Sequence, residues 1–380
     1  MQEARKLDAT TTKDCHTPGH NQRLTDRMVK DLMVNKRRLV EVPYTASLAH
    51  TMNALVANRV VALPVAAPPG HWIGAGGSMI METDKQTGVV RKHYIGMVTM
   101  LDILAHIGGV NDAAMDGSDV SDLDRKMSVE VSSIIGHCLE GLSLWTLNPN
   151  TSILDCMEVF SKGIHRAIVP VDSQMDNISG VELMESASSY RMLTQMDLLK
   201  FLKEHDSELK SITSHLINVL GAITHDVYAI TDRTTLLEAI KCMRTAMLNA
   251  VPIVRSSESP EEHHNQLVNG RGRKLIGTFS ATDLRGCHLA TLQSWLRLSA
   301  LEFTETVSTS PLYAASNATT PSRVLVSCQA EASLADVIDK LVTKHVHRVW
   351  VVDSHDSLVG LVSLTDIIRV LRVSLLCNPE

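Results

Sequence analysis

The sequence predicts an α/β protein built from four copies of one small domain. Four segments begin with Ser or Thr, continue with apolar residues at helical spacing, and end in a β-branched stretch typical of a buried strand. They start at Ser47, Ser152, Thr235 and Ser333. Four short apolar strands are each followed by Ser or Thr, two residues and an aspartate. These aspartates are Asp102, Asp197, Asp283 and Asp366.

The spacing of the aspartates, 95, 86 and 83 residues, sets the size of the repeat. It is too long for a solenoid unit, so each repeat is expected to be a small domain. The order within a repeat is lead strand, helix, strand, turn, strand, helix. The lead strands are expected at 39–43, 142–147, 227–231 and 324–328. Four small units with short sheets cannot each bury both faces alone, so we expect them to pair two by two.

The first helix of each repeat has a defined start. In three repeats an acid stands three residues after the Ser or Thr, which forms a capping box; these acids are Asp155, Glu238 and Asp336. The first repeat has His50 there. The expected organisation is an N-terminal arm (1–24), repeats at 25–109, 129–205, 223–297 and 322–375, connecting linkers at 110–128, 206–222 and 298–321, and a tail (376–380). The first repeat carries a Pro/Gly-rich insertion at 65–92 and the third a polar insertion at 255–273.

Composition argues against several classes of protein. Lys and Arg number 36 against 42 Asp and Glu, a net charge of −6, and a protein that coats nucleic acid would lean basic. Seven scattered cysteines indicate free thiols rather than disulfides or zinc ligands. The sequence shows no secretory signal and no apolar run near the roughly 20 residues that span a bilayer. We expect no metal, no nucleic-acid partner, no membrane contact and a cytoplasmic location, with the nucleus as a second compartment.

The Ser/Thr-x-x-Asp junctions have two interpretations. Each could simply cap the helix that follows, with the acid favoured by the helix dipole. A cap also tolerates Glu or Gln, yet all four repeats use Asp. A short, fixed carboxylate suits a vicinal diol, and a helix N-terminus suits an anion, so the junctions could hold a ribose phosphate. The residues concerned are Thr99 and Asp102, Thr194 and Asp197, Ser280 and Asp283, and Ser363 and Asp366.

Two His-Arg pairs stand at the helix-to-strand junction of alternate repeats, His165–Arg166 and His347–Arg348. Arginine binds phosphate in a bidentate manner, and the neighbouring histidine adds a donor. Each pair could also be a helix end with favourable positive charge. Their occurrence at one phase of the repeat favours a shared site. A further basic run, 36–38, is interpreted as a solvated turn.

These motifs resemble four cystathionine-β-synthase (CBS) motifs in tandem, which form two Bateman modules. More closely, 345–368, 198–202 and 37–56 are similar to the regulatory gamma subunits of AMP-activated and SNF1-type protein kinases, especially the plant gamma-like subunits. The resemblance covers roughly 25–375. It implies a flat pseudo-fourfold disc that binds AMP, ADP or ATP in central clefts, without catalytic activity. It also implies a kinase catalytic alpha subunit and a beta-type subunit as partners, with the N-terminal arm as a candidate docking segment.

The resemblance also implies roles for individual residues. Asp102, Asp283 and Asp366 match positions that hold ribose. One nucleotide site would gather around Asp366; its other members are Thr224, His347, Ser363 and Thr365. Groups that match positions around the other phosphates are Thr99, His165 and Arg166, with Arg348 also reaching inward.

The chain departs from the family in three places. The family has Lys then Arg where this chain has Met196 and Asp197, so a phosphate-binding lysine is lost and a carboxylate is regained. An arginine expected in the first repeat appears as Val61, with Arg59 two residues earlier. One extra residue follows Arg166, and a bulge there would re-aim its side chain.

The sequence leaves two alternative functions open and argues against a third. A stand-alone sensor would bind another adenosyl ligand, self-associate and need no kinase. An interaction scaffold would keep the disc and leave the clefts empty. An enzyme is disfavoured because the sequence shows no nucleophile elbow, P-loop, dinucleotide fingerprint or kinase signature, and the repeats take up almost the whole chain.

Overall fold

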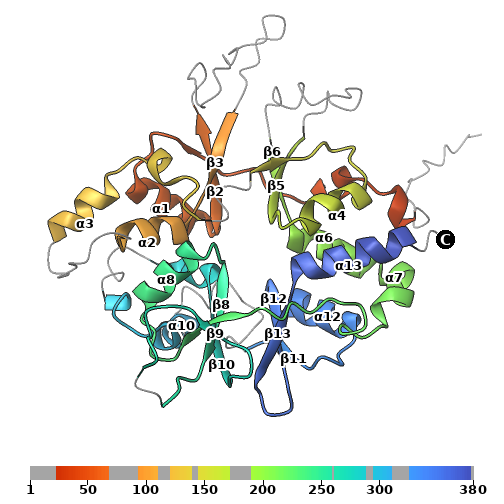
Figure 1. Ribbon diagram of the computed structural model, residues 1–380. Coiled ribbons are helices and arrows are strands. Elements are labelled where there is room, and N and C mark those ends of the chain that lie inside the picture. Colours follow the sequence, from red (N-terminus) through yellow and green to blue (C-terminus); the bar gives the residue numbers. More distant parts are fainter. Residues whose placement is uncertain are drawn as a thin grey trace, which may run out of the picture.

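A computed structural model describes residues 23–67, 93–109, 120–138, 144–171, 190–258, 261–287, 294–309 and 325–377. Within these ranges the chain forms four α/β repeats, as predicted (Figure 1). The expected insertion at 65–92 lies mostly outside the described residues, as do the first 22 residues of the N-terminal arm and residues 378–380 of the tail.

Each repeat has the predicted order of elements. Repeat 1 contains β1 (Val42–Pro43), α1 (Leu48–Asn58), β2 (Ala62–Ala67), β3 (His93–Thr99) and α2 (Met100–Ile107). Repeat 2 contains β4 (Trp145–Thr146), α4 (Ile153–Ser161), β5 (Arg166–Pro170), β6 (Tyr190–Thr194) and α6 (Gln195–Glu204). Repeat 3 contains β7 (Tyr228–Thr231), α8 (Leu236–Thr245), β8 (Ala250–Val254), β9 (Val268–Asn269), β10 (Leu275–Ser280) and the 3₁₀ helix η6 (Ala281–Gly286). Repeat 4 contains β11 (Ser327–Cys328), α12 (Leu334–Lys344), β12 (Arg348–Val352), β13 (Leu358–Ser363) and α13 (Leu364–Cys377).

The strands of each repeat form one small sheet. The orders are β1-β2-β3, β4-β5-β6, β10-β8-β7-β9 and β11-β12-β13. In every repeat the lead strand pairs in parallel with the strand after the first helix, which pairs antiparallel with the next long strand. Each long strand therefore ends at the junction that carries the aspartate.

The first helices begin where the sequence indicates. The side chains of four residues, Ser47, Ser152, Thr235 and Ser333, each accept a hydrogen bond from the backbone N–H three residues on. Of the three acids expected to complete capping boxes, Glu238 does so, since it accepts the backbone N–H of Thr235. Asp155 and Asp336 do not accept the backbone N–H of their cap residues, so that expectation is wrong for α4 and α12.

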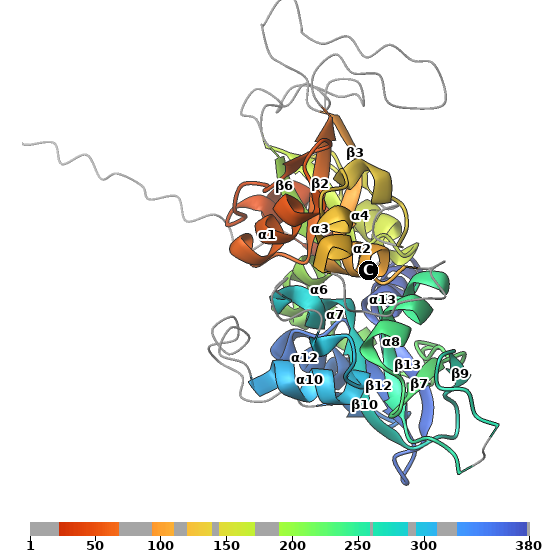
Figure 2. The ribbon, with the colours of Figure 1, turned by 90° about the vertical axis from the view of Figure 1, so that its left-hand side faces the viewer.

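The four repeats form a four-lobed disc (Figure 1). The sheets of repeats 1 and 2 meet through Tyr94 and Tyr190, whose rings pack edge-to-face with centroids 5.6 Å apart. The sheets of repeats 3 and 4 meet around Trp350. The two modules also pack against each other. One hydrophobic core contains side chains of repeats 1 and 3, and a second contains side chains of repeats 2 and 4. The view turned by 90° shows repeats 1 and 2 as one half and repeats 3 and 4 as the other (Figure 2).

Three expected linkers contain helices. Residues 110–128 include α3 (Val120–Met127), 206–222 include α7 (Asp206–Thr213) and 298–321 include α10 (Ala300–Thr309). Burial explains two of them: Leu209 and Ile212 of α7, and Phe303 and Val307 of α10, recur at helical spacing and enter the two large cores. The polar insertion at 255–273 likewise contains β9. The domain boundaries themselves stay a prediction.

The third repeat ends differently from the others. Where repeats 1, 2 and 4 place an α-helix after the aspartate, repeat 3 has η6, which stops at Gly286. Glycine is a poor helix former, which is consistent with the early end. No helix among the residues described above is long and apolar enough to cross a membrane.

Candidate functional site

The Ser/Thr-x-x-Asp junctions are capping boxes in all four repeats. In three of them the backbone N–H and the hydroxyl of the first residue both donate to Oδ2 of the aspartate, at 2.6–3.0 Å: Thr99 to Asp102, Thr194 to Asp197, and Ser363 to Asp366. In repeat 3 the Ser280 N–H donates to Asp283 Oδ2 at 2.7 Å, while its hydroxyl lies 3.0 Å from Oγ1 of Thr282. The boxes use Oδ2, so a ligand would have to approach Oδ1.

The four carboxylates differ in accessibility. As whole residues, Asp102 and Asp283 are 0% exposed and Asp366 is 9% exposed; the side chains of Asp366 and Asp197 are 13% and 20% exposed. Burial raises the pKa of Asp102, an effect that hydrogen bonds from Thr99 only partly oppose. A ligand therefore reaches Asp102 or Asp283 only if the segments that cover them move.

Of the cluster predicted around Asp366, Thr224 and Ser363 lie against its carboxylate. The segment that precedes repeat 3 runs beside β13, where the N–H of Thr224 and that of Leu361 each donate to the other residue's carbonyl oxygen at 2.9 Å. Thr224 is exposed, and its Oγ1 lies 3.4 Å from Oδ1 of Asp366. The Arg369 guanidinium is 3.5 Å from the same oxygen. Asp366 thus has one oxygen in the capping box and the other beside two exposed residues.

Thr365 binds a neighbour in repeat 2. The side-chain amide of Gln195, which is 4% exposed, donates to Oγ1 of Thr365 at 2.9 Å and to the carbonyl oxygen of Phe160 at 3.0 Å. The hydroxyl of Thr365 keeps its own hydrogen for donation. Gln195 therefore links the two repeats beside the Asp366 cluster.

The two His-Arg pairs occupy equivalent places. Arg166 pairs in register with Thr194, and Arg348 with Ser363, so each arginine lies opposite the hydroxyl residue of its own junction. The β5–β6 ladder runs without a register shift from Arg166 to Pro170. The expected bulge after Arg166 is therefore absent from the described strand, and that expectation is wrong there. The extra residue is accommodated after β5.

Repeats 1 and 3 have small residues at the same positions. Ala62 and Ala250 stand opposite Thr99 and Ser280. The guanidinium of Arg348 donates to the carbonyl oxygen of Ala250 at 3.1 Å, so a repeat 4 cation reaches into repeat 3. Arg59 cannot replace the missing arginine of repeat 1, because it is an exposed residue that ends α1.

Several basic side chains of the described chain gather at the centre of the disc. Desolvation and Arg348 lower the pKa of His165 to about 4, and desolvation with the nearby arginines lowers that of His347 to about 3. His347 keeps part of its surface exposed to solvent. Desolvation also lowers the pKa values of Arg166 and Arg348 to about 10. Such a field favours anions, and phosphate in particular.

Arg285 is a central residue that the sequence analysis missed. Its charge contributes to the lowered pKa values of Arg166 and His347. Aligning the four repeats would have singled out this residue. Two residues after the aspartate, repeats 1, 2 and 4 have Leu104, Leu199 and Ile368, so Arg285 interrupts a column of apolar residues. Asn249 was also missed; its amide nitrogen lies 3.2 Å from Nδ1 of His165.

The basic run 36–38 is not the solvated turn that we expected. Nζ of Lys36 lies 2.5 Å from Oδ2 of Asp197 in repeat 2, and the two side chains are 26% and 20% exposed. The guanidinium of Arg37 donates to the carbonyl oxygen of Asn58 at 3.1 Å. The carboxylate that this chain regains in repeat 2 is thus paired with a cation of its own N-terminal segment.

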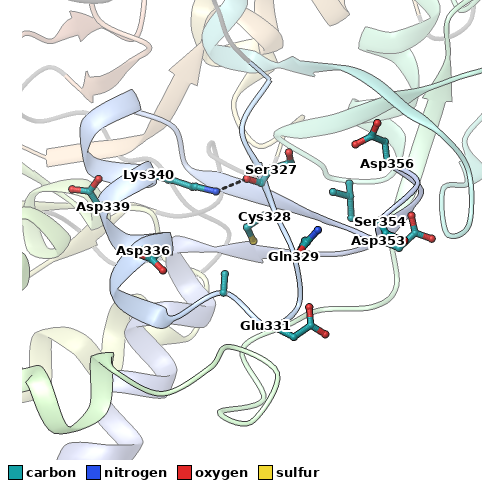
Figure 3. Close-up of a pocket in the computed structure, with 12 residues that line it drawn as sticks. Ser327, Cys328, Gln329, Glu331, Asp336, Asp339, Lys340, Asp353, Ser354 and Asp356 are labelled. Atoms are coloured by element: carbon teal, nitrogen blue, oxygen red, sulfur yellow. Dashed lines mark hydrogen bonds between the residues drawn. The ribbon is translucent and has the colours of Figure 1, made fainter.

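A cavity of about 660 Å³ lies elsewhere in repeat 4, lined by residues of β11, α12 and the β12–β13 turn (Figure 3). Its acids are Glu331, Asp336, Asp339, Asp353 and Asp356. Lys340 also lines it, and its Nζ donates to the carbonyl oxygen of Ser327 at 2.8 Å. The acidic lining would repel a phosphate group, so this cavity does not suit a nucleotide. The described side chains contain no group of three His, Cys, Asp or Glu residues that could hold a metal ion.

The chain is similar to known proteins over most of its length. Residues 318–373 match the family model described as CBS domain. The SNF1-related protein kinase regulatory subunits gamma-like PV42a and PV42b of Arabidopsis thaliana are 63% and 59% identical to it, each alignment covering 93% of this chain and 97% of the relative. The 5'-AMP-activated protein kinase subunit gamma-3 of Homo sapiens is 26% identical over 90% of this chain and 58% of its own length.

A solved structure supports the fold. A protein from Methanocaldococcus jannaschii, described as a putative archaeal homologue of γ-AMPK, superposes with a TM-score of 0.55. The superposition covers 90% of this chain and 99% of the archaeal chain at 18% identity. The similarity therefore extends over all four repeats and confirms the arrangement of CBS motifs.

Proposed function

The chain belongs to the gamma-like regulatory subunits of SNF1-related protein kinases, and from this membership we propose that it is a non-catalytic regulatory subunit that binds adenine nucleotides between its CBS repeats. Its partners would be an SNF1-related kinase catalytic alpha subunit and a beta-type subunit. AMP, ADP or ATP would serve as regulatory ligands and not as substrates.

The observation that carries this proposal is the cationic centre next to an accessible aspartate. Arg348 begins β12, directly after His347, and β12 pairs with the strand that leads into Asp366. A nucleotide carries both complementary groups: a diol that donates to a carboxylate, and phosphates that accept from guanidinium and imidazole groups. The ribose would bind Oδ1 of Asp366 and the hydroxyl of Thr224, with the phosphates directed toward the arginines.

The proposed nucleotide sites can be ranked by how exposed their aspartates are. The Asp366 cleft is the first candidate because its carboxylate, Ser363 and Thr224 all keep some solvent access. Asp102 and Asp283 are fully buried, so we infer that their clefts fill only after a local opening. The residues proposed for those clefts, Thr99 and Ser280, serve first as helix caps.

Regulation would follow from a difference in nucleotide affinity between two arrangements of the complex. The Asp366 cleft suits this role, since Thr224 belongs to the segment that joins the two modules. A ligand there would alter how the modules meet. The N-terminal arm (1–24) remains our candidate docking segment; nearly all of it lies outside the described residues. The free cysteines of the described chain accord with the cytoplasm or nucleus, where we place the complex.

Isothermal titration calorimetry of the purified chain with AMP, ADP and ATP at near-physiological salt tests the proposal. We expect saturable binding of at least one nucleotide. Asp366→Ala should weaken it by about 10- to 150-fold, the equivalent of losing charge-assisted hydrogen bonds worth roughly 1.5–3 kcal/mol.

Asp336→Ala is the matched control. Asp336 is also the acid of a Ser-x-x-Asp cap, with its N–H bonded to Ser333 Oγ at 3.1 Å, but it is exposed and far from the centre in the fold of repeat 4. The control should lose only the small stability of a cap and keep nucleotide affinity. If both variants bind like the wild type, Asp366 is a cap and nothing more.

A nucleotide-free scaffold is the second candidate. Two observations favour a scaffold. Asp102 and Asp283 are buried, and Asp197 is paired with Lys36, so the aspartates of three repeats are not available to a ligand in this structure. It predicts that no nucleotide binds while kinase subunits still co-purify with the chain. A stand-alone adenosyl sensor would instead bind its ligand and form homodimers without them.

A further inference from the structure

Four segments approach the cap of a first helix in the same way, and in repeat 3 the bridge joins Ser299 to Thr235, with the Ala300 N–H donating to Thr234 at 2.8 Å. The other three matter for the aspartates. Isolated antiparallel bridges join Met28 to Ser152, Glu130 to Ser47, and Leu216 to Ser333. In each case the residue after the bridge donates its N–H to the residue before the helix cap; these bonds are Val29 to Thr151, Val131 to Ala46, and Ile217 to Ala332, at 2.8–3.0 Å. The three segments are therefore structurally equivalent although their sequences differ.

Counting eight residues onward from Met28, Glu130 and Leu216 gives Lys36, Cys138 and Thr224, whereas the same count from Ser299 gives Val307 of the buried core. Each of the first three residues meets the strand-end aspartate of the repeat that its segment covers. Thr224 places a hydroxyl 3.4 Å from Asp366, and Lys36 places an ammonium group 2.5 Å from Asp197. Cys138 places its thiol against Asp102, whose charge, together with burial, raises the pKa of that thiol. We call this position the facing position.

Lys36 is fixed in place by the residues around it. Its carbonyl oxygen accepts a hydrogen bond of 2.9 Å from Nε of Arg191 in repeat 2, and its N–H donates to Met33 at 3.1 Å. The N–H of Leu39 donates to the carbonyl oxygen of Tyr190 at 3.2 Å, and Met33 is 7% exposed within the repeat 2 core. The pairing with Asp197 is therefore a consequence of how the segment docks, and not a loose surface contact.

We propose that Lys36 is an internal counter-ion that closes the repeat 2 cleft, and that the facing position decides which repeats of this chain accept a ribose. The ammonium group lies on Oδ2 of Asp197, the oxygen that also serves the capping box, and its charge neutralises the carboxylate whose Oδ1 a ribose hydroxyl would approach. A threonine hydroxyl at the same position in repeat 4 carries no charge and adds a polar group. The inference deepens the proposed function and rests on it for the choice of ligand.

The substitution Lys36→Thr (K36T) is the direct test, because it places at the facing position of repeat 2 the residue type that repeat 4 has there. The measurement is equilibrium dialysis with labelled AMP, which counts moles of AMP bound per mole of chain. We expect K36T to bind one more AMP than the wild type. The added site should disappear in a K36T variant that also carries Asp197→Ala. Lys30→Thr, an exposed lysine of the same segment, is the control and should leave the count unchanged.

The reciprocal substitution keeps the test decisive if K36T does not fold. Thr224→Lys should place an ammonium group against Asp366 and remove the repeat 4 site. Thr224→Val removes the hydroxyl without adding charge, and should weaken AMP binding by no more than several-fold, the value of one modest hydrogen bond. Circular dichroism of each variant confirms that it is folded.

The outcomes separate this inference from the proposed function. If the wild type binds AMP and neither K36T nor T224K changes the count, the facing position does not control access and the inference is wrong. If K36T weakens AMP binding, Lys36 is a phosphate ligand and the inference is also wrong. If the wild type binds no nucleotide but K36T gains one Asp197-dependent site, the inference stands and the proposed repeat 4 site fails. If no variant binds, both fail.

Discussion

The hydroxyl of Thr224 lies 3.4 Å from Oδ1 of Asp366, although 142 residues separate the two in the sequence. One residue belongs to the segment between the modules and the other to the first turn of α13. Their contact makes the Asp366 cleft a junction between parts of the chain that could move relative to each other. Displacing Thr224 should therefore affect ligand binding without changing any charge.

Gly360→Ala tests that relationship. A Cβ at Gly360 would lie 2.6 Å from the carbonyl oxygen of Thr224 and 2.7 Å from the Ile223 side chain, so the segment must shift. We expect AMP affinity at the Asp366 site to fall and stability to drop by about 1–3 kcal/mol from overpacking. Calorimetric titration and thermal unfolding measure the two effects.

Gly277→Ala is the control at the same position of repeat 3. A Cβ there would meet the Leu301 side chain at 3.0 Å, and a flexible side chain yields more readily than backbone. We expect a smaller loss of stability and unchanged AMP affinity. Equal effects of the two substitutions on AMP binding would show that Thr224 does not position the ligand.

Arg348→Ala should separate phosphate recognition from ribose recognition. Its guanidinium lies in the desolvated centre, where a charge-assisted hydrogen bond is worth roughly 1.5–3 kcal/mol. AMP affinity should therefore fall about 10- to 150-fold, while adenosine affinity should change little. Arg297→Ala, at an exposed residue, serves as the control. A similar loss for AMP and adenosine would place Arg348 away from the phosphate.

The central histidines predict loss of stability in acid. The pKa values of His347 and His165 are lowered to about 3 and about 4, so both stay neutral in the folded chain at pH 5, whereas the unfolded chain protonates near its ordinary value of about 6.5. The unfolded state then binds more protons, and stability falls as the pH drops from about 6.5 toward 4. The raised pKa of Asp102 acts in the opposite direction.

Thermal unfolding between pH 7.5 and 5 measures this effect. The unfolding temperature of the wild type should fall more steeply in acid than that of a His165→Gln, His347→Gln double variant. AMP should reduce the fall in the wild type, because a bound phosphate favours protonated imidazole. Parallel curves for the two proteins would contradict the assignment of neutral histidines to the centre.

His345→Gly should stabilise the end of α12. His345 is exposed and adopts φ 51°, a left-handed conformation that glycine accepts at no steric cost. We expect a gain of about 0.5–1 kcal/mol in the free energy of unfolding. Lys344→Gly, one residue earlier and still helical, should lose about 1 kcal/mol. Chemical denaturation of both variants checks the opposite signs.

Much of the fold follows from local patterns. Ser47, Ser152, Thr235 and Ser333 were identified as helix caps because capping depends only on neighbours in the sequence. The strand-end aspartates were found for the same reason. The helices within the expected linkers were missed, because their apolar pairs, such as Phe303 and Val307, are short signals that acquire meaning only when a core receives them.

The site was less predictable because it depends on contacts between repeats. Sequence repetition indicated that Asp102 and Asp366 were equivalent, yet Asp102 is 0% exposed and Asp366 is 9% exposed. What differs is the residue supplied by a distant segment, Cys138 in one case and Thr224 in the other. Arg285 was detectable in principle as a charge in an apolar column. The pairing of Lys36 with Asp197 had no local signal.

A crystal structure of the chain grown with AMP tests the central claim most directly. The account predicts AMP in the repeat 4 cleft, with its ribose hydroxyls on Oδ1 of Asp366 and its phosphate beside His347 and Arg348, while Lys36 still pairs with Asp197. An empty Asp366 cleft at saturating AMP, or AMP bound beside Asp197 with Lys36 in place, would contradict it.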